Sequence, residues 1–441
     1  MYAAATAAAA PGPALIRRLD PTNVRSPVWV IALGKAAAPL AATAVQLVRE
    51  HGIQLAGGLV VGPTDEDSPD PALTYFRGDH PEPGAGSLAA AGALEKLTSQ
   101  IGAHHEVWVL LSGGTTSLIG APEPGLTPDE LATIYSLLLG SGLDIAAMNR
   151  IRKRFSRWGG GKLARALAPA RVRGYVISDV IGDDLAAIGS GPCVPDPTTA
   201  QEVRLLLERG GLWSRIPAAA RRLITAVESG TSPETPKPGD PVFDRVSMDL
   251  IAGNRLALAA AAQRASELGL RATVNESPIA GEASGVGAAL ADSLLHNCAR
   301  PTNSQPNSTS PACFIWGGET TVTLGEHAAG TGGRCQELAL AAARVLQNAP
   351  AGTALLAAGT DGRDGPTDAA GAVVDEKTWQ AVTAAGRDPA QDLATHNAYA
   401  ALDAVGALLK PGLTGTNVMD VVIGVCSRAE RSTTGANPAP A

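Results

Sequence analysis

Three aspartates crowd one glycine-rich loop late in the chain. Asp361, Asp364 and Asp368 lie within residues 353–375, TALLAAGTDGRDGPTDAAGAVVD, whose apolar start at 354–358 predicts a buried strand. The glycines of this loop let backbone N–H groups approach a ligand without interference from a Cβ atom. Because crowded carboxylates repel one another, the pattern favours a bound cation or a cationic side chain; a solvated acidic turn would use the same residue types.

Two further strands are predicted to end in loops that suit an anion. The apolar run 27–33 leads through Gly34 and Lys35 into an alanine-rich helix, and a helix N-terminus beside a lysine attracts phosphate or carboxylate. The run 106–111 leads into SGGTTS at 112–117, whose backbone N–H groups and hydroxyls form a neutral anion cradle. A lone glycine–lysine pair also occurs in ordinary surface turns, so the second loop is needed to support the first.

A fourth loop and a basic cluster extend this pattern. The run 173–178 predicts a strand and continues into SDVIGDDLAAIGSGP, which contributes Asp179 and Asp183. Ahead of it, six cations surround three glycines, which in an acidic chain favours polyphosphate over a solvated helix face. These cations are Arg150, Arg152, Lys153, Arg154, Arg157 and Lys162. Ligands of open parallel α/β sheets bind outside the carboxyl ends of the strands, so we expect the four loops to converge on one cleft.

The part of the chain after a Pro- and Ser-rich hinge at 229–241 repeats the same arrangement. A strand is predicted to end at Gly317, Gly318 and Glu319, and a glycine loop then places Arg334 at the start of a helix. An arginine in this position can donate to two phosphate oxygens, and helix capping is the alternative role.

Length, composition and charge limit the class of protein. The 441 residues exceed one ordinary core, so two or three domains are expected. Lys and Arg total 35 against 42 Asp and Glu, a formal net charge of -7, which leaves no basic field for nucleic acid. No apolar run approaches the about 20 residues that span a bilayer, so we expect a soluble protein without a membrane partner. The scattered cysteines favour a reducing cytoplasm as its location. The five cysteines lack CxxC spacing, which argues against a disulfide framework or a zinc site.

Together, these motifs resemble the glycerate 2-kinases of the MOFRL and DUF4147 type, some of which carry the name hydroxypyruvate reductase. The resemblance runs from GKAA at 34–37 through LLSGGTTS, NRIRK, SDVIGDDLAAIGSGP, GGETTVTL and GGRCQELAL to LTGTNVMD at 413–420. It implies an α/β fold with a Rossmann-like parallel-sheet domain at 1–240, a smaller α/β domain at 241–429, and the active site in the cleft between them. A disordered tail is expected at 430–441. Thr115, Gly159 and Cys335 depart from the usual motifs, so the resemblance leaves substrate breadth open.

The resemblance also implies the activity: ATP- and Mg²⁺-dependent phosphorylation of D-glycerate to 2-phospho-D-glycerate. Lys35 and Arg334 match the family's catalytic pair. We assign Asp361 as a catalytic carboxylate and Asp179, Asp183 and Asp364 to the metal, although residue types alone leave these roles interchangeable. Substrate and nucleotide binding is assigned to the remaining motif residues: Ser112, Gly113, Gly114, Asn149, Arg152, Lys153, Ser190, Gly191, Gly317, Gly318, Glu319, Gln336 and Asn417.

Other functions compete with this hypothesis. An NAD(P)H-dependent hydroxypyruvate reductase needs a dinucleotide fingerprint, but the match at Gly84, Gly86 and Ala89 follows HPEP rather than a predicted strand. A noncatalytic metabolite sensor would keep the loops without needing the Lys, Arg and Asp set. A Walker-type kinase is excluded, since GGGKLA lacks both the leading glycine and the Ser or Thr after the lysine. The oligomeric state stays open, with a homodimer as one alternative.

Overall fold

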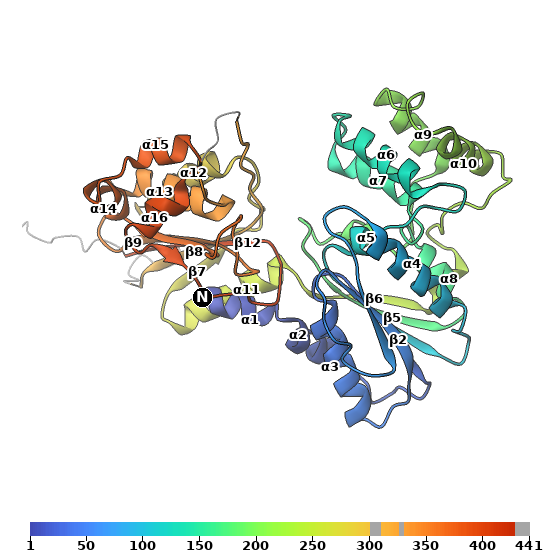
Figure 1. Cartoon of the computed structure of the whole chain (residues 1–441). Coiled ribbons are helices and arrows are strands. Elements are labelled where there is room, and N and C mark those ends of the chain that lie inside the picture. Colours follow the sequence, from blue (N-terminus) through green and yellow to red (C-terminus); the bar gives the residue numbers. More distant parts are fainter. Residues whose placement is uncertain (300–309, 326–329, 428–441) are drawn as a thin grey trace, which may run out of the picture. The chain divides into compact units, whose positions relative to one another are not determined.

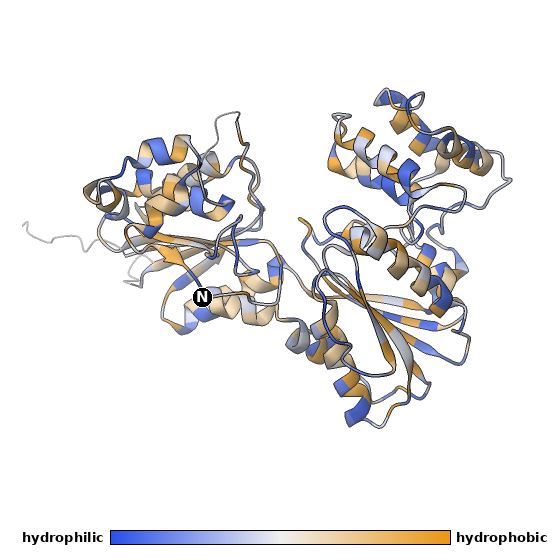
Figure 2. Cartoon of the chain, in the orientation of Figure 1, coloured by the Kyte–Doolittle hydropathy of each residue, from blue (hydrophilic) through white to orange (hydrophobic). Residues whose placement is uncertain are grey.

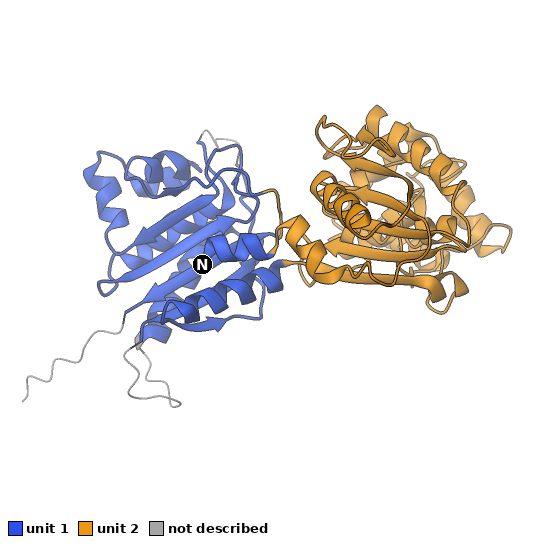
Figure 3. Cartoon of the chain, turned by 90° about the horizontal axis from the view of Figure 1, so that it is seen from below, with its two compact units in different colours: residues 1–8, 254–414, 419–441 blue, residues 9–253, 415–418 orange. Residues whose placement is uncertain are grey.

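The computed structural model describes residues 1–299, 310–325 and 330–427, and the chain forms two compact units (Figure 3). Unit 1 comprises residues 1–8, 254–414 and the chain from 419 onward, and unit 2 comprises residues 9–253 and 415–418. The expected tail at 430–441 lies outside the described residues.

The chain changes unit at a different point from the boundary expected at 240. Residues 246–252 form the last strand of the unit 2 sheet, so the crossing falls after Gly253. The first eight residues belong to unit 1, where Tyr2 is buried and its hydroxyl donates to the carbonyl oxygen of Gly359 at 2.7 Å. Hydrophobic patterning at the N-terminus does not reveal this placement, because the partner lies 357 residues away.

Unit 2 contains a six-stranded sheet in the order β3-β2-β1-β4-β5-β6, with every neighbouring pair parallel (Figure 1). The strands are β1 (Val28–Leu33), β2 (Leu55–Gly62), β3 (Leu73–Arg77), β4 (Glu106–Leu111), β5 (Arg171–Ile177) and β6 (Val246–Ala252). This is the strand order of Rossmann folds, and it confirms the predicted α/β class. From β1, the chain adds β2 and β3 on one side of the sheet and β4, β5 and β6 on the other. Sheets of this kind bind ligands at this switch point, between β1 and β4.

Helices cover both faces of this sheet, which explains why the central strands β1 and β4 are apolar and buried along nearly their whole length (Figure 2). One face carries α2 (Pro11–Arg18) and α3 (Ala37–Glu50). The other face carries α4 (Ala85–Thr98), α5 (Thr115–Leu118) and α8 (Lys162–Leu167). Four more helices pack around a separate apolar cluster: α6 (Pro128–Leu139), α7 (Ile145–Phe155), α9 (Ala200–Arg209) and α10 (Ala218–Glu228). Two short helices complete the unit: η1 (Ile188–Ser190) and η2 (Pro241–Arg245).

Unit 1 contains a mixed six-stranded sheet in the order β11-β10-β9-β12-β8-β7. Its strands are β7 (Arg271–Val274), β8 (Ala312–Gly318), β9 (Thr353–Gly359), β10 (Gly371–Asp375), β11 (Leu408–Leu409) and β12 (Asp420–Cys426). One face carries α1 (Tyr2–Ala8) and α11 (Asn254–Glu267) (Figure 1). The other carries α12 (Ala283–Ala299), α13 (Arg334–Leu346), α14 (Thr378–Ala384), α15 (Pro389–Ala394) and α16 (Ala398–Asp403). No helix formed by the described residues is long and apolar enough to cross a bilayer.

Strand β12 is antiparallel to both β8 and β9, so it begins at the edge where they end. Asp420, its first residue, lies opposite Gly318 in β8 and Gly359 in β9. The Asp420 carboxylate therefore lies beside the loops that follow β8 and β9, although Asp420 is the first residue of its own strand.

The prediction of no disulfide is wrong for one pair of cysteines. Cys298 at the end of α12 is bonded to Cys426 at the end of β12, with their Cα atoms 6.3 Å apart. The two residues are separated by 128 positions in the sequence. Local cysteine spacing therefore contains no signal of the bond, which requires α12 to pack along the sheet.

We expect a thiol titration of unfolded, unreduced protein to detect three thiols, those of Cys193, Cys313 and Cys335. After reduction, all five cysteines should react. Reduction should destabilise unit 1 by about 2–4 kcal/mol, because the cross-link restricts the unfolded chain; Cys298→Ala should reproduce that loss without reductant. Five reactive thiols before reduction would contradict the bond.

Candidate active site

Lys35 lies at the switch point of the unit 2 sheet. It follows β1, and its backbone N–H donates to the carbonyl oxygen of Gly113 in the loop after β4 at 2.9 Å. In the same loop, the Ser112 hydroxyl accepts from the N–H of Ala36 at 2.9 Å. These bonds join the two loops, while the Lys35 side chain stays exposed and available to an anion.

The cradle after β4 depends on two glycines. Gly114 has a φ of +85°, and a Cβ there would lie 3.2 Å from His80 and 3.4 Å from Cγ of Lys35. A Cβ on Gly113 would lie only 1.8 Å from a carboxylate oxygen of Asp179, in the loop after β5. The φ of Gly114 favours glycine there, and a side chain at Gly113 would displace the Asp179 carboxylate, so backbone approaches a lysine, a histidine and an aspartate closely at this point.

His80 is a site residue that the sequence assignment omitted. Its pKa is lowered, first by burial and then by the positive charge of Lys35, which places the imidazole beside the lysine as a neutral group. The loop that carries it follows β3, and Asp79 in that loop accepts a hydrogen bond from the N–H of Ser87 at 3.1 Å. The first turn of α4 is thus occupied by a carboxylate, at the position where the Gly84 fingerprint would hold a pyrophosphate.

The loop after β5 contacts the same cradle. The Ser190 hydroxyl and the Thr116 hydroxyl are 3.0 Å apart, and the carbonyl oxygens of Ser190 and Gly191 accept from the glycine run at 160–161 at 2.8 Å each. One carboxylate oxygen of Asp183 is buried and has no hydrogen-bond partner among the described residues. The structure therefore brings three of the four expected loops together in unit 2.

Three of the six cations in the basic cluster are engaged in ion pairs. Arg154 is paired with Glu234 and Arg157 with Glu95, and the Lys162 ammonium group contacts Glu123 at 2.5 Å. Lys162 also donates to three carbonyl oxygens at the end of α7, so it caps that helix. These three cations hold the fold together, which the sequence could not show because their acidic partners are distant in the chain.

Lys153, another member of this cluster, forms no ion pair among the described residues. It is buried, and within the same part of the chain its ammonium group makes no hydrogen bond. Burial lowers its pKa, while the negative charges of Asp196 and Asp184 oppose that shift. Arg152 lies over the ring of Tyr135, with 5.3 Å between guanidinium carbon and ring centroid. Asn149, on the same helix, is half-buried.

The remaining loop, which carries three aspartates after β9, belongs to unit 1, where it meets the start of the helix that begins at Arg334. The guanidinium is paired with Glu319 after β8 and with Asp420 at the start of β12, the latter at 3.4 Å. Asp420 is 2% exposed, and its second carboxylate oxygen has no hydrogen-bond partner in the described part of the chain. The sequence assignment did not include Asp420, although the residue ends the LTGTNVMD motif at 413–420.

Asp364 and Gln336 support the helix that carries Arg334. The two carboxylate oxygens of Asp364 accept from the N–H groups of Cys335 at 3.2 Å and Gln336 at 2.8 Å. The buried Gln336 amide donates to the carbonyl oxygen of Asp364 and to the Thr367 hydroxyl. Both residues thus bind the loop after β9 to α13. Asp361, in that loop, accepts from the N–H of Arg363 at 3.0 Å.

Burial sets the protonation of the two inner carboxyl groups. It raises the pKa of Asp420 to about 7, against the opposing charge of Arg334, and the pKa of Asp364 to about 6, against two backbone hydrogen bonds. Above pH 7, both groups are charged in a poorly solvated place. Arg334 is then the cation that balances them.

The stability of unit 1 is expected to fall as the pH rises from about 4 to 7. The folded state retains a proton on Asp420 up to pH about 7, whereas the unfolded chain releases it near pH 3.8, so protonation favours the folded state in this window. The slope is at most about 1.4 kcal/mol per pH unit for one proton. Urea unfolding at several pH values should show a smaller slope for Asp420→Asn than for wild type. The exposed Asp368→Asn, whose pKa is lowered rather than raised, is the control; equal slopes for wild type and Asp420→Asn would contradict the expectation.

The other binding residues are distributed between the units. Gly317 and Gly318 end β8 in unit 1, and a Cβ on Gly317 would lie 1.9 Å from the side-chain oxygen of Asn254. Asn417 lies in the short segment 415–418 that belongs to unit 2. Of the metal candidates, Asp179 and Asp183 lie in unit 2 and Asp364 in unit 1. Within the ranges that the structure describes, no three His, Cys, Asp or Glu side chains are grouped to hold a metal ion.

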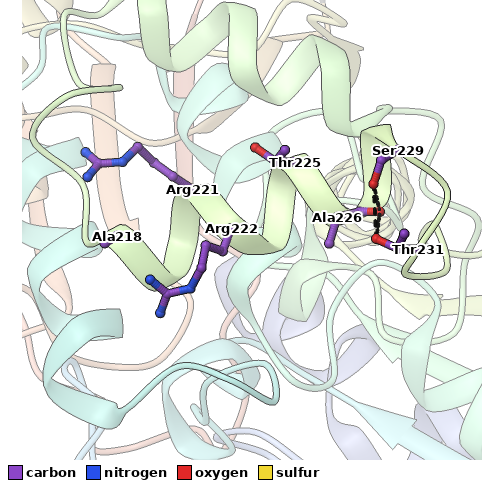
Figure 4. Close-up of a pocket in the computed structure, with 7 residues that line it drawn as sticks. All are labelled: Ala218, Arg221, Arg222, Thr225, Ala226, Ser229 and Thr231. Atoms are coloured by element: carbon purple, nitrogen blue, oxygen red, sulfur yellow. Dashed lines mark hydrogen bonds between the residues drawn. The ribbon is translucent and has the colours of Figure 1, made fainter.

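A separate surface pocket along α10 contains none of these residues (Figure 4). It is lined by Ala218, Arg221, Arg222, Thr225, Ala226, Ser229 and Thr231. Arg221 donates to the carbonyl oxygens of residues 213, 214 and 216, so its guanidinium is already engaged. We therefore place the candidate site at the strand-end loops.

Unit 2 carries a lysine beside a glycine cradle and unit 1 carries an arginine between carboxylates, and residues of these types suit a phosphotransferase. Family models match residues 1–225 as Domain of unknown function (DUF4147) and residues 312–420 as the MOFRL family. The chain belongs to the glycerate kinase family, which confirms the resemblance seen in its motifs.

Similar proteins match over nearly the whole chain. Glycerate 2-kinase of Pyrococcus horikoshii is 35% identical over 91% of this chain and 88% of its own length. D-glycerate 2-kinase of Thermotoga maritima is 35% identical over 90% of each protein. The crystal structure of a Thermotoga maritima glycerate kinase superimposes with a TM-score of 0.86 at 34% identity, covering 96% of this chain and 97% of that one.

Proposed function

We propose that the protein phosphorylates D-glycerate with ATP and Mg²⁺ to give 2-phospho-D-glycerate. The observation that carries this proposal is the exposed Lys35 at the switch point of the unit 2 sheet, directly beside the amide cradle of Gly113 and Gly114. Phosphoryl transfer needs chiefly positioning and stabilisation of charge, and a lysine beside oriented amides supplies both. The 2-kinase names of the archaeal and Thermotoga relatives support the 2-position.

In this proposal, the residues of unit 2 bind phosphate and the residues of unit 1 balance transferred charge. Lys35 and the cradle hold phosphoryl oxygens, and Lys153 and Ser190 contribute a buried cation and a hydroxyl beside the same loops. Arg334 in unit 1 is assigned to bind phosphoryl oxygens, and its guanidinium pairs with Asp420 at 3.4 Å. Asp361 remains the candidate to accept the proton of the substrate hydroxyl.

The loop after β5 fits a divalent cation better than the loop after β9. Mg²⁺ prefers carboxylate and water oxygens, and Asp183 has a buried carboxylate oxygen without a hydrogen-bond partner among the described residues. Asp179 packs against Gly113 of the cradle, so a cation there would lie next to bound phosphate. Asp364 fits less well, because both its oxygens already accept backbone N–H groups. When bound, Mg²⁺ would neutralise phosphate charge, held by Asp179 and Asp183.

An assay for both ADP and product identity tests this function. Purified protein with D-glycerate, ATP and Mg²⁺ should release ADP only when glycerate is present. Adding enolase should then consume the product directly, because enolase dehydrates 2-phosphoglycerate and not its 3-phospho isomer. Product that enolase consumes only after a phosphoglycerate mutase is added would refute the 2-position.

The same plate tests the reductase alternative with hydroxypyruvate and NADH or NADPH. Oxidation of the nicotinamide without ADP release in the kinase wells would overturn the kinase proposal. Failure of any turnover despite tight ATP binding would favour a noncatalytic sensor instead. We also propose a cytoplasmic location, where ATP and three-carbon acids are available.

A further inference from the structure

Unit 1 contains a cavity that the assignments above leave without a ligand. Its volume is about 580 Å³, within the range of small-molecule sites. Arg334 lines this cavity, together with Thr320, Val322, Leu324, Pro366 and His396. A cation, two polar groups and an apolar wall are thus present in one space.

The cavity is formed by backbone that long-range hydrogen bonds hold in place. The glycine loop before α13 is fixed by bonds from Gly330 N–H to the Thr395 oxygen at 3.1 Å and from Tyr399 N–H to the Thr331 oxygen at 3.0 Å. The Asn397 side chain accepts from the N–H of Thr331 at 3.1 Å. The site is therefore preformed within unit 1, which favours binding over collapse.

Two polar side chains in this cavity have unused hydrogen-bonding capacity. Thr320 is fully buried, and its hydroxyl has no partner among the residues that the structure describes. A buried hydroxyl without a partner is costly, so this group points to a missing ligand or water. His396 contacts the buried Glu337 through Nδ1 at 2.8 Å. This contact engages Nδ1, so Nε2 is the ring nitrogen that, among the described residues, remains for a hydrogen bond with a ligand.

The lining favours a nucleoside over the three-carbon acid. Glycerate has no apolar surface to bury and would leave most of this volume empty. A purine presents a flat apolar face to Val322, Leu324 and Pro366, and a ribose presents hydroxyls to Thr320. Leu324 is 69% exposed, so its side chain is accessible to a ligand in the cavity.

We propose that this cavity binds the adenine nucleoside of ATP, with the phosphate chain running to Arg334. The inference rests on the proposed kinase function and extends it by assigning nucleoside recognition to unit 1. Leu324 and Val322 contact the base, and Nε2 of His396 forms a hydrogen bond with the base or with ribose.

Isothermal titration calorimetry of the full chain tests the proposed nucleoside site. The affinity is measured for ADP with Mg²⁺ and, separately, for pyrophosphate. Leu324→Gln removes apolar contact without adding charge, and should weaken ADP about tenfold while changing pyrophosphate affinity less than about twofold. His396→Asn retains a residue type that tolerates the φ of +54° at this position, and should also weaken ADP but not pyrophosphate. Leu268→Gln, at a leucine that is 53% exposed beyond α11, is the matched control and should change neither affinity.

The outcomes separate this inference from the kinase function. Unchanged ADP affinity in Leu324→Gln, or an equal loss for pyrophosphate, overturns the nucleoside site even if wild type phosphorylates glycerate. Absence of ADP binding by wild type also overturns it. A selective loss of ADP affinity supports the site, and does so even if wild type shows no glycerate-dependent ADP release.

Discussion

Replacing Lys35 by alanine is expected to lower kcat for D-glycerate phosphorylation by about two to four orders of magnitude. The Lys35 side chain is exposed, and its fold contacts are made by its backbone, which alanine retains. The free energy of unfolding should therefore change by less than about 0.5 kcal/mol. Steady-state kinetics and urea unfolding of the same preparations measure the two effects.

Two control variants sharpen this test. Lys96→Ala removes an equally exposed lysine at the end of α4 and should leave kcat unchanged. Lys35→Arg keeps the charge but replaces a compact ammonium group with a planar fork, so it should recover only part of the activity. Near-normal turnover in Lys35→Ala would remove the residue from the mechanism.

Replacing Arg334 by alanine should lower kcat by a similar factor of about two to four orders of magnitude. Unlike Lys35, Arg334 also has a structural partner, because Asp420 is buried against it. Loss of the guanidinium removes the charge that opposes the raised pKa of Asp420, so that pKa should rise above 7. The variant should then be destabilised more at pH 8, where Asp420 must ionise, than at pH 6, where it holds its proton.

Kinetics and unfolding at both pH values test this double effect. Arg344→Ala, in the last turn of the same helix, removes an exposed arginine and should alter neither quantity by much. Equal destabilisation of Arg334→Ala at pH 6 and pH 8 would mean that Asp420 does not titrate in this range. Unchanged kcat would mean that Arg334 serves only the fold.

Part of the candidate site could be predicted because it follows local rules. Lys35 and the SGGTTS loop each come directly after an apolar run, and the carboxyl ends of parallel strands lie at one edge of a sheet. Adjacent pairing of β1 and β4 then brings the two loops into contact. The glycines of the SGGTTS loop predicted that other groups approach the backbone closely there. The Asp179 carboxylate, which lies beside Gly113, is one such group.

Other members of the site could not be predicted from local pattern. Asp420 precedes its strand, and it reaches the site only because β12 runs antiparallel to its neighbours. Strand direction depends on which strands pair, and the apolar character of a single strand does not encode this. The capacity of the basic cluster to bind phosphate was overestimated, because the acidic partners of its cations are distant in the sequence. Arg154 and Glu234 are 80 residues apart, and Arg157 and Glu95 are 62 apart.

The sequence by itself determined the strands, the glycine loops at their ends and the residue types those loops carry. These features depend on hydrophobic periodicity and on backbone freedom over a few residues. Only the tertiary structure decided that three of the four loops meet in unit 2 while the fourth meets Arg334 in unit 1. It also placed the first eight residues in unit 1 and joined Cys298 to Cys426. Those outcomes depend on contacts between residues that are 28 positions apart for Gln336 and Asp364 and 357 apart for Tyr2 and Gly359. Such contacts form only when whole elements pack together.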